Sequence, residues 1–282
     1  MKLMEWTEVI KPRRSLLDLR LKEVWHYRDL LALFVKRDFV ATFKQTILGP
    51  GWFFIQPILT TLMFTVVFGN IAGIKVDGLP RMLFYLSGLT IWNYFSDSFT
   101  KTSNVFVTNA NMFGKVYFPR LIMPLAVVSS GLMRFGVQFC LFFSVWIYYM
   151  FKTPEKIHPN WAIVLLPLLI LMMASIAFGA GIIISSLTTK YRDLAMLITF
   201  GVTLLMYATP VIYPMSQVPS KYKAFVMANP LSPIIETFRY AFLGTGQLSW
   251  VNLFYSFCWV IVLLATGTLM FNKVEQRFMD TV

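Results

Sequence analysis

Six long apolar stretches set the pattern of hydrophobic and polar positions along this chain. They cover residues 52–71, 82–99, 125–151, 161–187, 194–213 and 250–271. Four of them carry no charged residue, whereas Asp97 lies in the second and Arg134 in the third. A helix needs about 20 apolar residues to cross the hydrocarbon core of a bilayer. The pattern therefore predicts an all-α membrane protein with six transmembrane helices.

The segments between these spans are short, which indicates one transmembrane domain over residues 1–282 and no second globular domain. Residues 1–50 form an amphipathic entry, because their apolar positions recur with helical spacing among basic residues. This pattern is typical of a helix lying in the membrane interface, with a simple anchor as the alternative. The entry lacks the short apolar core of a cleaved signal, so we expect the first span to be retained.

The connection between the second and third spans contains a helix-compatible run, Ser103–Phe113, which Gly114 closes. Its polar residues are interleaved with valine, phenylalanine and methionine, so it is too apolar for an idle solvated loop. Docking onto a partner and burial against the membrane surface both explain this composition.

Residues 214–249, between the fifth and sixth spans, are rich in proline and predict two short helices. These helices cover Ser220–Ala228 and Pro233–Leu243, with Ser232 as the N-cap of the second. The two charged residues of the second helix are expected on its surface, away from its apolar face. Because both helices are too short to span and too apolar to be free, we expect an outer re-entrant hairpin buried in protein. The alternative is an interfacial hairpin resting on the outer leaflet.

The distribution of lysine and arginine predicts the orientation. Residues 1–50 hold ten of these residues directly before the first span. With six spans the two termini share one side, and that side then carries 17 basic residues against seven on the other. We therefore place both termini in the cytoplasm.

Composition narrows the candidate chemistry. Apolar residues make up 57% of the chain and charged residues 13%, against roughly 25% charged residues in a soluble domain. The net charge of +12 favours anionic lipid headgroups as the partner over nucleic acid. The chain lacks the G-x-x-x-x-G-K-[ST] phosphate-binding loop, metal-ligand spacings and catalytic constellations. We therefore predict no catalytic residue, no metal and no cofactor in this chain.

Ionisable residues inside the spans are the usual mark of ion-coupled transport. Asp97 lies near the cytoplasmic end of its span and could reach the headgroups. Arg134 lies deeper, where its side chain either snorkels to the boundary or binds an anionic substrate group. Since no carboxylate lies in the middle of a span, a proton relay has no carrier, and a secondary antiporter is disfavoured.

Four motifs follow one another along the chain. The entry contains Lys36-Arg37-Asp38, the run KQTILGPGW at residues 44–52, and Gln56-Pro57. The cytoplasmic connection contains FGKVYFPR at residues 113–120, and Pro124. The outer segment contains PVIYP at residues 210–214, NPL at residues 229–231, and Arg239, and the tail contains Glu275, Phe278 and Asp280. In this order the motifs resemble the permeases of bacterial ABC exporters of lipid-linked polysaccharides and teichoic acids, the Wzm/TagG type. Thr42-Phe43 departs from that family, which often has a basic residue and tyrosine there.

The resemblance implies that two copies of the permease pair with two copies of a separate ATPase, which binds ATP and Mg²⁺. Residues 103–118 would form the coupling helix that enters a cleft in the ATPase, and the candidates for ATPase coupling are Asn109, Asn111, Met112, Phe113, Lys115, Phe118 and Arg37. The outer hairpin would form a gate, with Pro210, Tyr213, Pro214, Asn229, Pro230, Glu236 and Arg239 as its candidates. For contact with the substrate we add Trp52, Phe53, Gln56 and Arg134.

These patterns together predict the membrane subunit of an ATP-driven exporter in the bacterial plasma (inner) membrane. Its cargo would be a lipid-linked polysaccharide, such as O-antigen of lipopolysaccharide, or a teichoic-acid-type polymer. One alternative is an ABC permease for a drug or a lipid. A second alternative is an ATP-independent membrane channel or scaffold, which needs no coupling helix.

Overall fold

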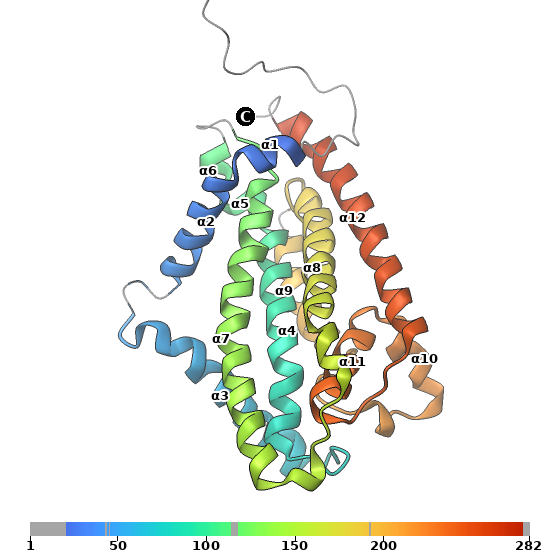
Figure 1. Cartoon of the computed structure of the whole chain (residues 1–282). Helices are drawn as coiled ribbons and strands as arrows, with labels where there is room; N and C mark the ends of the chain where they lie inside the picture. The colour runs from blue at the N-terminus through green and yellow to red at the C-terminus, as the bar shows by residue number, and fades with distance from the viewer. Residues whose placement is uncertain (1–20, 43, 45, 114–117, 192, 279–282) are drawn as a thin grey trace, which may run out of the picture.

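The computed structural model describes residues 21–278 except 43, 45, 114–117 and 192, and this part of the chain is helical without β-strands (Figure 1). The all-α prediction is thereby confirmed. The α-helices are α1 (Leu21–His26), α2 (Arg28–Ala41), α3 (Trp52–Phe64), α4 (Arg81–Ser103), α5 (Val105–Thr108), α6 (Ala110–Phe113), α7 (Ile122–Lys152), α8 (Leu166–Thr188), α9 (Leu194–Tyr207), α10 (Ser220–Ala228), α11 (Leu231–Leu243) and α12 (Trp250–Phe278). Short 3₁₀ turns are η1 (Gly49–Gly51), η3 (Pro154–Lys156), η4 (Trp161–Leu165) and η5 (Met215–Gln217), and the π-helix η2 (Thr65–Ile71) continues α3.

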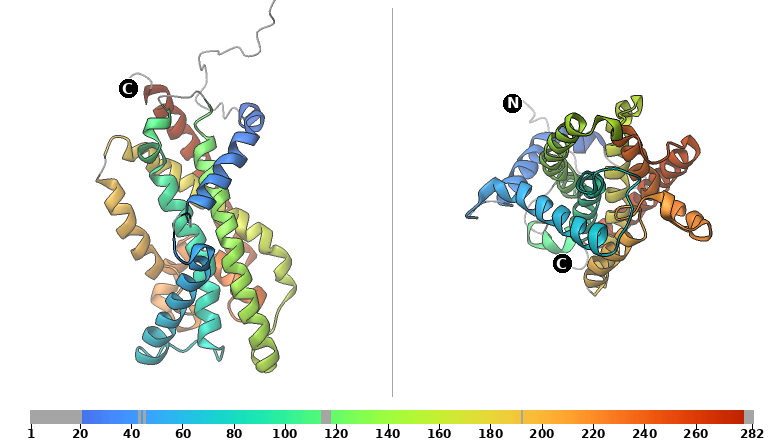
Figure 2. Two further views of the ribbon diagram at one scale, coloured as in Figure 1. Left: turned by 90° about the vertical axis from the view of Figure 1, so that its left-hand side faces the viewer. Right: turned by 90° about the horizontal axis from the view of Figure 1, so that it is seen from below.

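Helix α4 lies at the centre of the bundle and packs against α3, α7, α8 and α9 (Figure 2). Every residue from Leu83 to Trp92 is buried, including the polar Ser87 and Thr90. Both hydroxyls donate hydrogen bonds to carbonyls of their own helix, those of Phe84 and Leu86. A helix that faces protein on all sides does not need an uninterrupted apolar surface, which is why α4 tolerates these polar residues.

Four helical segments are long and apolar enough to cross a membrane, namely Gly49–Ile71, Ile122–Lys152, Trp161–Thr188 and Trp250–Val274. The predicted second span is the long helix α4, which is less apolar than these four. The predicted fifth span, residues 194–213, is not one continuous helix, because α9 stops at Tyr207 after 14 residues. Pro210 has no N–H to continue the helix, and the chain makes a tight turn with Val211 N donating to the Thr209 carbonyl, 2.7 Å.

Helix α11 is buried around its whole circumference, so its ends need partners from other elements. Four of its last carbonyls accept hydrogen bonds from α7 and the chain after η3. The Trp146 Nε1–H donates to the Phe242 carbonyl, and the His158 backbone N–H donates to the Leu243 carbonyl. Asn160 donates twice, from its backbone N–H to the Ala241 carbonyl and from its side-chain amide to the Tyr240 carbonyl. These bonds satisfy the C-terminus of α11 without water and hold it inside the bundle.

The start of α11 differs from the prediction. The helix begins at Leu231, so Ser232 is not its N-cap, and its hydroxyl donates instead to the Val226 carbonyl, 2.7 Å. Pro230 occupies the N-cap position, and the side chain of Asn229, one residue before it, accepts a hydrogen bond from Leu231 N through Oδ1, 3.0 Å. Helix α10, by contrast, covers the predicted residues Ser220–Ala228.

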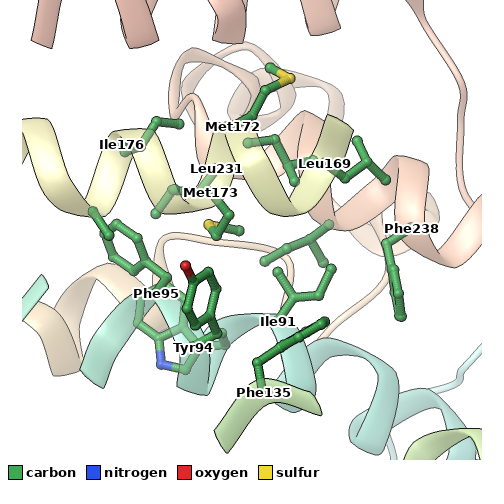
Figure 3. Close-up of a cluster of buried hydrophobic side chains, with 14 of the residues drawn as sticks. Ile91, Tyr94, Phe95, Phe135, Leu169, Met172, Met173, Ile176, Leu231 and Phe238 are labelled. Atoms are coloured by element: carbon green, nitrogen blue, oxygen red, sulfur yellow. The ribbon is translucent and has the colours of Figure 1, made fainter. Parts of the chain in front are cut away.

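Aliphatic, methionine and aromatic side chains fill the space around α4. Figure 3 shows Ile91, Tyr94 and Phe95 of α4 facing the α8 row from Leu169 to Ile176, with Phe135 of α7 closing one side. Leu231 and Phe238 bring α11 into the same cluster. This core joins four helices that are distant in the sequence.

Helices α8 and α12 approach each other closely at two glycines. A Cβ on Gly267 would lie 2.7 Å from the Gly179 carbonyl oxygen, and a Cβ on Gly179 would lie 2.8 Å from the Leu263 carbonyl carbon. Both positions therefore need glycine for the backbones to approach, as at other small-residue contacts between membrane helices. Gly179 of α8 thus serves a contact within one copy of the chain.

Candidate functional site

Helices α1, α5, α6 and the end of α12 gather at one end of the bundle, which the sequence predicts to be cytoplasmic (Figure 1). Helix α2 packs along α7 below them. The connection between α4 and α7 is anchored to α2 by Phe118, which is buried and lies edge-on to Phe34 with ring centroids 5.8 Å apart. The Arg37 guanidinium covers the same Phe34 ring at 4.7 Å. The amphipathic entry and the connection are therefore one packed unit.

The helix-compatible run Ser103–Phe113 is helical in three separate pieces and does not form one continuous helix. The chain forms the end of α4 and two four-residue helices, α5 and α6, with Asn104 and Asn109 at the breaks. Both asparagine amides donate back to the carbonyl four residues earlier, at 3.0 and 2.9 Å, and both residues leave helical backbone angles. Asparagine favours such breaks because its side chain competes for the backbone.

The predicted coupling residues occupy different environments. Met112 is half-buried against the core, and Asn109 follows the last residue of α5. Phe118 is buried. Arg37 also forms an ion pair with Asp38 at 2.8 Å. Lys115 lies outside the described residues, as do the side chains of Asn111 and Phe113. Met112 and Asn109 are therefore the described candidates that lie in the connection and are partly accessible.

The predicted substrate residues do not share one environment. Trp52 and Gln56 are exposed on α3, and Phe53 stacks on Phe39 of α2 with ring centroids 5.4 Å apart. Pro57 lies inside α3, as expected for a kinked helix. Arg134, by contrast, is buried on α7.

Arg134 has a partner that the sequence did not indicate. Its Nη1 lies 3.4 Å from Asp97 Oδ2 of α4, so the two ionisable residues of the predicted spans form one ion pair. The Arg134 side chain is 11% exposed and the Asp97 side chain 55% exposed. Pairing of this kind is how charges are accommodated at membrane depth. The pair satisfies Arg134 without snorkelling and leaves one side of Asp97 accessible.

A second cluster, called the outer cluster because the sequence predicts this part of the chain to lie on the outer side, is built around Arg239 of α11, whose side chain is 1% exposed. Its Nη2 donates to the Val211 carbonyl at 2.6 Å, its Nη1 to the Pro210 carbonyl, and its Nε to Ser87 Oγ at 3.4 Å. The guanidinium also lies over the Phe84 ring, 3.8 Å from its centroid. One side chain thus joins α11 to α4 and to the turn after α9.

Glu236 precedes Arg239 by one helical turn and is also buried, with its Oε1 3.6 Å from Arg239 Nη1. The prediction that both charged residues lie on the surface of the second short helix is therefore wrong. Burial lowers the pKa of Arg239 to about 10 and raises the pKa of Glu236, because both charges have lost water. The charge of each residue opposes the pKa shift of the other, so each residue depends on its partner to remain charged.

The other predicted gate residues surround this cluster. Asn229 Nδ2 donates to Thr209 Oγ1 at 2.7 Å, and the Pro230 carbonyl accepts from Ser256 of α12 at 2.8 Å. Pro214 is buried beside the cluster, whereas the Tyr213 hydroxyl donates locally to the Tyr207 carbonyl, 3.0 Å. The structure thus brings Pro210, Asn229, Pro230, Glu236 and Arg239 around α11.

A pair of contacts closes the outer end between two loops. Ser216 Oγ donates to Asp77 Oδ1 at 2.6 Å, and the Gln217 side chain donates to the Lys75 carbonyl. These bonds connect the loop before α4 to η5. Asp77 itself adopts a left-handed backbone with φ of 48° in the turn before Gly78. The spacing Glu-x-x-Arg places both charges one helical turn apart, but it does not indicate that they are buried. Nothing in the sequence signalled the loop contacts.

Known proteins resemble this chain over most of its length. The chain is 28% identical over 256 residues to an O-antigen export system permease protein, RfbA, of Klebsiella pneumoniae, covering 89% of this chain and 94% of that protein. RfbA, an O-antigen export system permease protein of Myxococcus xanthus, is 24% identical over 263 residues, which cover 93% of this chain and 98% of that protein. The polysialic acid transport protein KpsM of Escherichia coli is 20% identical over 258 residues, which cover 89% of this chain and 95% of that protein.

The match to a protein family covers most of the chain. The family described as ABC-2 type transporter matches residues 29–243, from the start of α2 to the end of α11. This range includes the connection between α4 and α7, the Asp97–Arg134 pair, and Glu236 with Arg239. The expected kinship with ABC exporter permeases is confirmed, and the chain belongs to the ABC-2 type transporter family.

Proposed function

We propose that this chain is the membrane subunit of an ATP-driven exporter of polysaccharide in the bacterial inner membrane. The observation that carries the proposal is its similarity to O-antigen and polysialic acid export proteins over about nine-tenths of both lengths. The cargo would be a lipid-linked polysaccharide, or a teichoic-acid-type polymer. Two copies of the chain would pair with two copies of a separate ATPase subunit, which binds ATP and Mg²⁺.

The proposal includes six membrane crossings, by α3, α4, α7, α8, α9 and α12. Central α4 can cross without an apolar surface because other helices enclose it. Helix α9 has 14 residues and is about 21 Å long, so residues 208–213 would complete the crossing of a core of about 30 Å. An even number of crossings agrees with α1 and the end of α12 lying at the same end of the bundle. Both termini would be cytoplasmic.

In the mechanism, α4 would transmit force from the ATPase to the outer cluster. Its cytoplasmic end leads directly into α5 and α6, and its outer end carries Phe84, Ser87 and Gly88, which contact Arg239. The 23 residues of α4 form a rod about 35 Å long. ATP-driven displacement of the connection would move this rod and shift α11, which forms the outer gate. Such rigid-body transitions occur between two packed arrangements.

The first test of this function is purification of the chain from native membranes in a mild detergent, followed by mass spectrometry. We expect a soluble ATPase with a G-x-x-x-x-G-K-[ST] loop to co-purify in stoichiometric amount. In a strain that lacks the chain, the surface polysaccharide should be missing. If the chain is recovered alone from membranes that contain such an ATPase, a channel or scaffold becomes the better reading.

Replacing Met112 with aspartate tests the coupling role. A half-buried thioether in the connection suits an apolar cleft in the ATPase, and a carboxylate there would be desolvated without a partner. We expect the affinity for the ATPase to fall about 30-fold, as for a hot spot of about 2 kcal/mol, with export lost. Met112→Leu is the matched control and should retain both. Wild-type ATPase affinity in a correctly inserted Met112→Asp variant would exclude this coupling role.

A further inference from the structure

A pocket of about 250 Å³ opens at the outer end of the bundle, beside the Arg239 cluster. Four segments line it: α4 and the loop before it, η5, α11, and the loop between α11 and α12. Its wall includes buried Glu236 and Arg239, and its rim includes exposed Ser216, Gly246 and Gln247. The pocket therefore joins a buried charged wall to the outside of the protein.

Glu236 presents an unused acceptor at this wall. Its side chain is 3% exposed, and its Oε1 has no hydrogen-bond partner within the described part of the chain. Arg239 Nη1, at 3.6 Å, is too distant for a good hydrogen bond, and that guanidinium already donates to two carbonyls and to Ser87. A buried carboxylate oxygen without a donor costs free energy, so a ligand that donates to it would bind favourably.

The charges of the pocket decide which kind of ligand it accepts. Asp77 and Glu236 contribute two carboxylates, against one guanidinium from Arg239. This excess of acceptors opposes phosphate and other anions. A divalent cation at Glu236 Oε1 would lie near the Arg239 guanidinium and be repelled by it. A neutral ligand with several hydroxyl groups remains, since each hydroxyl can donate to a carboxylate and accept from the Gln247 amide or the Thr245 hydroxyl.

The size agrees with a small ligand. A volume of about 250 Å³ is slightly below the roughly 300–1,000 Å³ of pockets that hold drug-sized molecules. We propose that this pocket is a sugar-binding subsite, in which Glu236 and Asp77 accept hydrogen bonds from the hydroxyl groups of one sugar residue of the exported polymer. This inference rests on the proposed function and adds to it a residue-level contact at the outer end of the path. A phosphate group of the polymer would not enter this subsite.

The test uses the full-length chain, purified in a detergent without a sugar headgroup. The probe is a phosphate-free oligosaccharide fraction, released by mild acid from the surface polysaccharide of the same cells. Saturation-transfer NMR should show transfer from the wild-type protein to the sugar-ring protons. Glu236→Gln should weaken binding about tenfold, the effect of losing one hydrogen bond to a charged group. Gln247→Leu, at an exposed position where folding is not at risk, should weaken it as well.

Glu155→Gln provides the matched control, because Glu155 is exposed in η3 on the same outer side and does not line the pocket. It should bind like the wild type. Absence of saturation transfer to the wild type, or equal binding by Glu236→Gln and Gln247→Leu, would overturn the subsite. Thermal stabilisation by Mg²⁺ that Glu236→Gln abolishes, without sugar binding, would identify a cation site instead. Surface polysaccharide in the deletion strain is measured separately, so failure of the export function is distinguished from failure of the subsite.

Discussion

Replacing Arg239 with methionine should give the largest loss of stability of any single substitution considered for this protein. The change removes a fully buried guanidinium that donates to Pro210, Val211 and Ser87, and it leaves Glu236 as a buried, unpaired carboxylate. Removing one partner of a buried ion pair lowers the free energy of unfolding by about 3–5 kcal/mol. We expect a clear fall in the thermal unfolding midpoint of the detergent-solubilised chain, together with loss of surface polysaccharide.

Two further variants separate the buried pair from a general effect of losing arginine. Arg28→Met removes an exposed guanidinium from α2 and should leave the unfolding midpoint nearly unchanged. The double variant Arg239→Met with Glu236→Gln removes both charges and should recover part of the lost stability, because no unpaired charge is left. If Arg239→Met unfolds at the same temperature as Arg28→Met, Arg239 does not hold the outer cluster together.

Substituting Gly88 with alanine should also destabilise the outer cluster. A Cβ at Gly88 would lie 2.6 Å from Arg239 Nη2 and 2.9 Å from the Val211 carbonyl oxygen. Both distances are too short, and Val211 O is a backbone atom that cannot move aside cheaply. The guanidinium would have to leave its acceptors, at an overpacking cost of about 1–3 kcal/mol. The measurement is again the unfolding midpoint, with export as the functional readout.

Gly136→Ala supplies the matched control, because Gly136 lies inside helix α7 and a Cβ there would meet nothing within 4 Å. Alanine favours helix over glycine by roughly 1 kcal/mol, so this variant should be as stable as the wild type or more stable. A Gly88→Ala variant that behaves like Gly136→Ala would show that α4 and the turn after α9 are not in close contact.

Much of the helical framework follows from local sequence. Long apolar stretches predicted α7, α8 and α12 because their side chains face lipid or core along the whole length. The bounds of α10 also agree with the prediction. The errors lie where a single residue competes with helix formation, at Asn104 and Asn109 in the connection and at Pro210 after α9. The spacing of apolar residues alone does not predict such breaks in a helix.

The sequence by itself determined that this is an all-α membrane protein, and its ordered motifs were enough to indicate its family, because apolar length and local motifs are carried by neighbouring residues. Tertiary structure decided which charges are buried and with what partners. Arg134 meets Asp97 only because α4 and α7 pack together, and Arg239 enters the core only because α4 presents Gly88 and Phe84 to it. The sequence of a helix with a Glu-x-x-Arg pair is the same whether the pair is buried or exposed. The difference lies in the packing of helices distant in the chain, where burial removes water and leaves protein groups as the only partners.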